Sequence, residues 1–324
     1  MKTPEYSLII PVCNEEDTLI ELYNRLIGLM SQLDNETEVI LIDDGSNDRS
    51  YALMLSIHTK DPRFKIVHFS RNFGHQIAIT AGMNYATGNA VIIMDADLQD
   101  PPEVVLEMVS RWREGYDIVY AVREERLGES WFKKITATLF YRLMQRITQI
   151  EIPVDAGDFR LVGRKALEAY QSLSEHNRYV RGLFSWIGFK QIGITYQRSA
   201  RFAGKTKYSF KKMFKLAVDG MISFSDAPLN FLIKLGITMT ILSLLGSFSG
   251  LLLNKQFNSF AWIGLLIVFV GGLQLVGMGF IGVYLSRIYD ETRKRPLYII
   301  EALHGLETKP KSISNPEMSD LKHA

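Results

Sequence analysis

Two aspartates, Asp95 and Asp97, stand two residues apart directly after the apolar run at residues 91–94. Residues two apart on an extended segment point to the same side, so we expect both carboxylates to face one site. Such a pair repels unless a cation lies between its members, and a hard divalent ion with oxygen ligands meets this need. Asp95 and Asp97 are therefore candidate ligands of Mg2+ or Mn2+, with Gln99 as a third. A solvated acidic turn is the alternative interpretation.

Two further polar pairs follow apolar runs in the same way. Asn14 and Glu15 come after residues 7–13, and Asp43 and Asp44 come after residues 38–42. In open α/β sheets, ligands bind outside the carboxyl ends of the strands. We therefore expect these polar residues and the Asp95 pair to surround one ligand.

The elements that must position these residues alternate between strands and helices. Apolar runs predict strands at residues 7–13, 38–42, 64–69, 90–94 and 117–122, and helical patterns lie between them. One such pattern starts at Asp17 and places leucines 19, 22, 26 and 29 on one face. Alternating strands and helices predict an α/β domain with a mostly parallel sheet, covered on both faces.

Two long apolar segments follow this domain. Residues 235–253 and 260–285 contain no charged residue, and each run meets the length of about 18 residues that marks a membrane-spanning helix. The short link between them predicts an antiparallel hairpin. Lysines and arginines cluster before the first segment and after the second, so the positive-inside rule places both termini in the cytoplasm. Gly246 and Gly250 suit helix contacts within a homo-oligomer, or reflect ordinary membrane-helix composition.

Two other segments combine an apolar stripe with basic residues, at residues 132–147 and 210–221. This pattern is typical of helices that lie in the headgroup layer of a membrane. An ordinary helix packed on the domain remains the alternative, above all for the first segment.

Overall composition excludes some classes. The chain has 324 residues and a net charge of +2, which does not indicate a nucleic-acid-binding protein. It has a single cysteine, Cys13, so no internal disulfide forms. The first seven residues lack the basic start and apolar core of a secretory signal.

Three motifs occur in a characteristic order: Pro11-Val-Cys-Asn-Glu-Glu, Asp43-Asp-Gly-Ser-Asn-Asp, and Asp95-Ala-Asp-Leu-Gln-Asp-Pro-Pro-Glu. Together with Gly204-Lys-Thr-Lys-Tyr-Ser and the paired apolar segments, they resemble inverting GT-A glycosyltransferases of the dolichyl-phosphate-mannose synthase group. Within that group the chain is most similar to bacterial polyprenyl-phosphate glycosyltransferases, notably bactoprenol glucosyltransferases. Cys13 departs from the pattern, since many relatives have tyrosine there.

The resemblance implies a role for each matching position. It places Pro11, Asn14, Glu15 and Asp44 at the nucleoside of a nucleotide-sugar donor. It places Asp95, Ala96 and Asp97, with Gln99, at the metal and the diphosphate. It implies contacts between the phosphate of the acceptor and Arg123 and Arg201, with Lys207 as a helper.

Asp158 matches a functional aspartate of the family. We interpret it as a general base or as a positioning group, with capping of the next segment as the structural alternative. For residues 71–74, which precede a helix, an N-terminal cap and a donor contact both remain open.

The expected organisation is a cytoplasmic GT-A catalytic domain at residues 1–204 and an amphipathic juxtamembrane helix at residues 205–230. Two transmembrane helices at 231–286 and a cytoplasmic tail at 287–324, disordered at its end, complete it. This arrangement places the protein in the cell inner membrane.

The expected reaction is inverting transfer of glucose from UDP-glucose to undecaprenyl phosphate. Other donors remain open: UDP-N-acetylglucosamine, UDP-galactose, an aminoarabinose derivative and GDP-mannose. A processive polysaccharide synthase would need more membrane helices and a Gln-x-x-Arg-Trp motif. A non-catalytic nucleotide-sugar-binding scaffold would have no reason to keep Asp95, Asp97, Arg123 and Arg201 together.

Overall fold

The computed structural model describes residues 4–124, 156–176, 178–198, 232, 234–238, 241 and 259–307. Its centre is a sheet of eight strands in the order β7-β5-β6-β4-β1-β2-β3-β8. The strands are β1 Tyr6–Val12, β2 Thr37–Asp43, β3 Phe64–Phe69, β4 Ala90–Ile93, β5 Ile118–Arg123, β6 Ala156–Gly163, β7 Gln191–Tyr196 and β8 Ile300–His304. The five strands expected from the sequence are all present, with ends shifted by at most two residues.

The sheet is mostly parallel, as expected. β1 pairs in parallel with β2 and β4, β2 with β3, and β5 with β7. β6 is antiparallel between β4 and β5, and β8 is antiparallel to β3 at the edge. Because β6 runs in the opposite direction, its first residues lie at the same edge as the carboxyl ends of the parallel strands.

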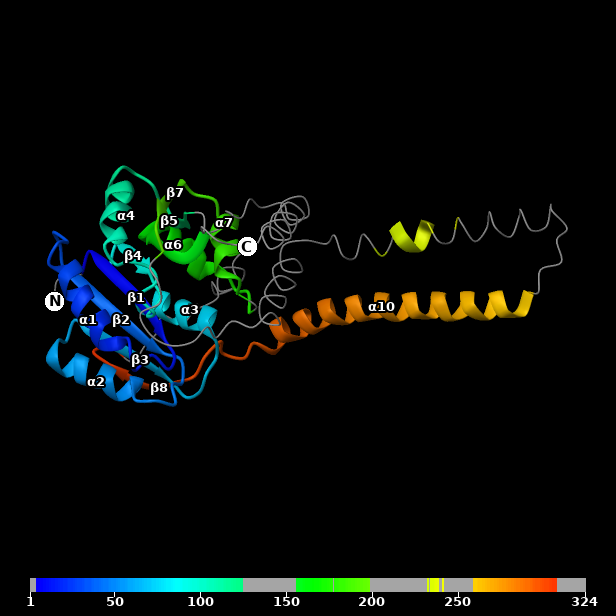
Figure 1. The fold of residues 1–324 in the computed structure, drawn as a ribbon, viewed down its shortest axis with the longest axis horizontal. Coiled ribbons are helices and arrows are strands. Elements are labelled where there is room, and N and C mark those ends of the chain that lie inside the picture. Colours follow the sequence, from blue (N-terminus) through cyan, green and yellow to red (C-terminus); the bar gives the residue numbers. More distant parts are fainter. Residues whose placement is uncertain are drawn as a thin grey trace, which may run out of the picture.

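Helices cover both faces of the sheet (Figure 1). Alternate residues of β1 point to opposite faces, so Leu8 and Ile10 join one apolar cluster and Ile9 joins the other. The first cluster includes residues of α1 Leu19–Met30, α2 Ser50–Lys60 and α4 Val104–Arg113. The second includes residues of α3 His75–Tyr85, α6 Arg164–Ser172 and α7 Val180–Trp186. Each large apolar side chain buried in this way contributes about 1.5–3 kcal/mol, which holds the strand ends in place.

A single long helix, α10 Ser259–Arg293, extends away from the sheet domain (Figure 1). Its 35 residues correspond to about 50 Å at the helical rise, which exceeds the ~30 Å of a bilayer core. Residues 269–293 are apolar enough to cross a membrane, and large apolar side chains such as Leu275, Met278 and Leu285 are exposed. α10 occupies the second expected span. Most of the first span and its link to α10 lie outside the described residues, and so does the expected hairpin.

After α10 the chain returns to the sheet and forms β8, a strand that the sequence analysis did not anticipate. The ring of Tyr298 stacks on Phe69 at a centroid distance of 5.1 Å, and Asn84 donates a hydrogen bond to its hydroxyl at 3.1 Å. The apolar run at residues 297–300 is so short that its periodicity does not distinguish a strand from a helical segment. The end of the long helix is therefore tied to the sheet domain.

Candidate functional site

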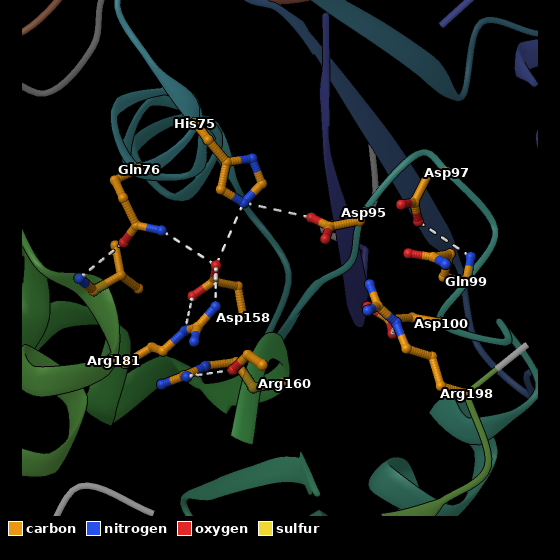
Figure 2. A network of polar contacts seen from close by, with 12 residues as sticks. His75, Gln76, Asp95, Asp97, Gln99, Asp100, Asp158, Arg160, Arg181 and Arg198 are labelled. Carbon is orange, nitrogen blue, oxygen red and sulfur yellow. Dashed lines mark hydrogen bonds and ion pairs between the residues drawn. The ribbon is translucent and has the colours of Figure 1, made fainter. Parts of the chain in front are cut away.

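The register between β4 and β6 brings two acidic residues together. Ile93 pairs with Arg160 in this antiparallel ladder, so the next positions outward place Asp95 opposite Asp158. His75, the first residue of α3, lies between them. Its Nε2 is 3.4 Å from Asp95 Oδ1 and 3.4 Å from Asp158 Oδ2 (Figure 2). The centre of the site is thus an imidazole between two carboxylates.

Asp158 is buried, and several donors surround its carboxylate. Arg181 on α7 donates from Nε to Oδ1 at 2.8 Å and from Nη2 to Oδ2 at 3.1 Å. Gln76 donates to Oδ2 at 3.2 Å, and its own Oε1 accepts from the backbone N–H of Val180 at 3.0 Å. Burial alone would raise the pKa of Asp158, but Arg181 and His75 outweigh it and hold that pKa well below its usual range. Asp158 is therefore ionised and firmly held.

Asp95 is in a different electrostatic environment. Its Oδ1 is buried and accepts no hydrogen bond from the residues that the structure describes. Burial, followed by repulsion from Asp100, Asp158 and Asp97, raises the pKa of Asp95 to about 6 despite the attraction of His75. Although burial opposes it, the attraction of Asp95 and Asp158 raises the pKa of His75 to about 9. An imidazolium thus lies against the Asp95 carboxylate.

The Asp95 pair follows β4 in a turn, because the strand ends at Ile93. The extended segment expected from the sequence is therefore absent there, yet both side chains remain at the same edge (Figure 2). Asp97 accepts a hydrogen bond from the backbone N–H of Gln99 at 3.1 Å. Among the described residues, Asp95 Oδ1 accepts no hydrogen bond and has His75 Nε2 at 3.4 Å as its ion-pair partner. Such an oxygen, close to other carboxylates, fits a hard divalent cation. No group of three or more His, Cys, Asp or Glu poised for a metal occurs in the described part of the chain.

The expected nucleoside loop is built from the ends of β1 and β2. Asn14 accepts a hydrogen bond from the backbone N–H of Asn47 at 2.7 Å, and Glu15 donates its backbone N–H to Ser50 at 2.8 Å. Pro11 is buried within β1. These contacts join the two loops at the carboxyl edge of the sheet, where the sequence analysis placed them.

Asp44 caps the segment that leads into α3. Its carboxylate accepts from the backbone N–H of Phe73 at 2.6 Å and from that of Gly74 at 3.0 Å. Asp44 therefore has a structural role as a cap, beside the nucleoside contact that the family resemblance implies. Asp43 caps its own loop as well, because it accepts from the backbone N–H of Ser46 at 3.1 Å.

A second polar group lies on the other side of Asp97. Tyr196 donates a hydrogen bond to Asp100, and Arg123 Nε contacts the Tyr196 hydroxyl at 3.4 Å. Arg198 Nε is 3.7 Å from Asp100 Oδ1 (Figure 2). The predicted phosphate ligand Arg123 is thus held at the end of β5, beside the acidic turn.

The structure therefore gathers most of the predicted site residues at one edge of the sheet. Arg201 and Lys207 lie outside the described residues. Sequence reasoning missed His75, Gln76 and Arg181 as members of the site. His75 directly follows the 71–74 segment that had been singled out, but the sequence alone carries no signal that connects α7 to Asp158.

Comparison with known proteins identifies the family. Residues 7–171 match the family model described as Glycosyl transferase family 2. The Bacillus subtilis (strain 168) protein named uncharacterized glycosyltransferase YkcC is 49% identical over 309 residues, which cover 94% of this chain and 96% of that protein. The Escherichia coli (strain K12) prophage bactoprenol glucosyl transferase homolog is 35% identical over 299 residues, which cover 91% of this chain and 98% of that protein.

These similarities extend over the catalytic domain and most of the remaining chain. The eight-stranded, mostly parallel sheet is the GT-A-like α/β fold that the motifs implied. The chain therefore belongs to glycosyl transferase family 2 and is a glycosyltransferase homologous to bactoprenol glucosyl transferases.

Proposed function

We propose that this enzyme transfers one glucose from UDP-glucose to undecaprenyl phosphate at the cytoplasmic face of the membrane, with inversion at the anomeric carbon. The observation that carries this proposal is the buried Asp95 oxygen that accepts no hydrogen bond from the described residues, beside Asp97 at the carboxyl edge of the sheet. The names of the relatives that match over most of the chain support the polyprenyl acceptor.

Asp95 and Asp97 would hold Mg2+ or Mn2+, with Gln99 beside them. When bound, the ion supplies Lewis-acid stabilisation of the negative charge on the departing diphosphate. The ends of β1 and β2, with Asn14, Glu15 and Asp44, orient the nucleoside. Together these residues would hold the donor at the carboxyl edge of the sheet.

The acceptor phosphate needs cations rather than a base. A phosphate monoester is already anionic at neutral pH, so it attacks without losing a proton. Arg123 would contact this phosphate, with Arg201 and Lys207 from the segment before the first span. Arginine suits this role because its planar fork donates two parallel hydrogen bonds to phosphate oxygens. The apolar α10 helix would keep the site at the membrane, where the lipid acceptor resides.

The test is transfer of radiolabelled sugar to undecaprenyl phosphate in detergent, with a panel of UDP- and GDP-sugars, with and without EDTA. We expect one labelled lipid, from UDP-glucose, which disappears with EDTA and returns with excess Mn2+. A labelled lipid from another donor would identify a different sugar and retain the reaction class. No labelled lipid from any donor would reject the polyprenyl-phosphate acceptor, and with it the proposal.

Two variants separate chemistry from folding. Asp95→Asn should remove turnover and leave thermal unfolding unchanged, because it removes a metal ligand without changing side-chain volume. Glu107→Gln on α4 is the matched control, since it makes the same chemical change on an exposed helix face. Full activity of Asp95→Asn would contradict the metal role of that residue.

A further inference from the structure

Asp158 occupies the position where a proton acceptor would be sought, but its surroundings oppose that role. A general base must have a free oxygen that faces the group it deprotonates. Both oxygens of Asp158 already accept hydrogen bonds, from Arg181 at 2.8 and 3.1 Å and from Gln76 at 3.2 Å. Its side chain is only 5% exposed. The same contacts keep it ionised, which makes it a weak proton acceptor.

The surroundings of Asp158 are rich in arginine. Arg160 lies on the same face of β6, donates from Nη2 to the carbonyl of Gly157 at 3.0 Å, and keeps a buried Nε with no hydrogen-bond partner among the described residues. Arg123 approaches from β5, since a Cβ added at Gly157 would lie 3.1 Å from its Nη2. Arg181 binds the Asp158 carboxylate, so three arginines converge on residues 157–158.

This concentration of positive charge indicates a site for an anion. The Arg181 side chain is 28% exposed, in contrast to its carboxylate partner, so a ligand has access to it. A guanidinium carries five N–H donors, and one edge can bind a carboxylate while another binds a phosphate. The Asp158–Arg181 pair lies across His75 from Asp95 (Figure 2). Arg123 approaches the same residues from the Tyr196 and Asp100 side.

We propose that Arg181, together with Arg123, binds the phosphate of the acceptor lipid, and that Asp158 is a positioning residue that holds the Arg181 guanidinium. This inference rests on the proposed function. In the transfer step, an oxygen of the lipid phosphate forms a bond to the anomeric carbon as the bond from that carbon to the diphosphate oxygen breaks. The electron pair leaves with the nucleoside diphosphate, and no proton is transferred.

The kinetic test compares Arg181→Ala, Asp158→Asn and the double variant in the full-length enzyme. Loss of a charge-assisted contact should raise the KM for undecaprenyl phosphate about 10- to 100-fold and leave the affinity for UDP with Mn2+ unchanged. Asp158→Asn should have a similar effect, and the double variant should be no worse than Arg181→Ala alone, because the two residues act as a unit. Arg181→Lys, which keeps the charge, should recover part of the loss.

A general base would give a different pattern. Asp158→Asn would then lower kcat while the KM for the acceptor stayed unchanged, and Arg181→Ala would leave the KM for the acceptor unaffected. Either result would overturn the inference. Arg113→Ala is the matched control, because it breaks another Arg–Asp pair, with Asp34, that lies beside the first residue of β1.

A binding measurement separates this inference from the proposed function. Titration calorimetry with a short-chain prenyl phosphate should show binding to the wild type and a loss in Arg181→Ala, with no binding of the prenyl alcohol. Such a result in an enzyme that transfers no sugar would reject the proposed function and retain the phosphate site. Equal binding by wild type and Arg181→Ala would overturn the site. Equal affinity for inorganic phosphate would overturn its assignment to a lipid.

Discussion

Replacement of Gly45 by alanine should destabilise the catalytic domain and weaken nucleotide binding together. Gly45 has a φ of +64°, and an added Cβ would lie 2.5 Å from the backbone carbon of Arg71 and 2.5 Å from the backbone nitrogen of Asn72. These are backbone atoms, so no side-chain rotation relieves the contact. The left-handed conformation costs a residue with a Cβ about 1–2 kcal/mol, and overpacking adds about 1–3 kcal/mol.

The same contact joins this turn to the nucleotide loops. Asn72 donates to the carbonyl of Asp44 at 3.0 Å and to Cys13 Sγ at 3.3 Å. A displaced segment at residues 71–72 would loosen both contacts, which lie at the ends of β1 and β2. We therefore expect a lower affinity for UDP in addition to the lower stability.

Two other glycines provide matched controls. Gly115 also has a positive φ, +91°, but a Cβ there would meet nothing within 4 Å, so Gly115→Ala should lose about 1–2 kcal/mol. Gly28 lies within α1, also with open space around it, so Gly28→Ala should gain about 0.5–1 kcal/mol. Thermal unfolding in detergent, followed by intrinsic fluorescence, measures these differences in stability, since the unfolding temperature shifts by roughly 2–4 °C per kcal/mol.

We expect the unfolding temperature to be highest for Gly28→Ala, followed by wild type, Gly115→Ala and Gly45→Ala in that order. Calorimetric titration with UDP should show a loss only for Gly45→Ala. If Gly45→Ala unfolds at the same temperature as Gly115→Ala and binds UDP normally, the steric contact at residues 71–72 is unimportant and the argument is refuted.

Three further changes test other parts of the molecule. Burial alone raises the pKa of Glu38, but its lysine, serine and threonine partners outweigh burial and hold it below 4.5. Glu38→Gln should thus lower the free energy of unfolding by about 2–4 kcal/mol at pH 7. The difference from wild type should shrink as the pH falls and the wild-type carboxylate becomes protonated. Glu36→Gln, at an exposed position, is the control and should show no such loss. Tyr298→Ala should lose about 2–3 kcal/mol in thermal unfolding through its stacking on Phe69, and Tyr298→Phe about 0.5–1.5 kcal/mol; equal losses would contradict the stacking. Asp97→Asn should lower turnover about 100-fold or more at unchanged unfolding temperature, with partial recovery in excess Mn2+; wild-type turnover with an unchanged Mn2+ requirement would contradict its role as a ligand.

Part of the site was predictable because it is encoded locally. An apolar run followed by acidic residues indicates a buried strand with polar groups at its end. This pattern spans only about ten neighbouring residues. The sequence alone therefore predicts that Asn14, Asp44 and Asp95 lie at one edge of a parallel sheet. Parallel strands all present their carboxyl ends at the same edge, so local patterns sufficed for this conclusion.

The role of Asp158 could not be decided in the same way. Its neighbours His75, Gln76 and Arg181 come from α3 and α7, and the separation between Gln76 and Asp158 is 82 residues. Whether an aspartate accepts a proton or holds an arginine depends on which donors reach its oxygens. That arrangement results from packing between elements and has no periodic signature in the sequence.

The sequence by itself determined the α/β class, five of the eight strands with the polar residues that follow β1, β2 and β4, and the apolar segment that forms α10. These depend on hydrophobic periodicity and on short motifs, which act over a few residues. Only the tertiary structure decided that β6 runs antiparallel and brings Asp158 to Asp95, and that β8 ties the end of α10 to the sheet. Strand pairing and long-range ion pairs are set by how distant elements bury their apolar faces together.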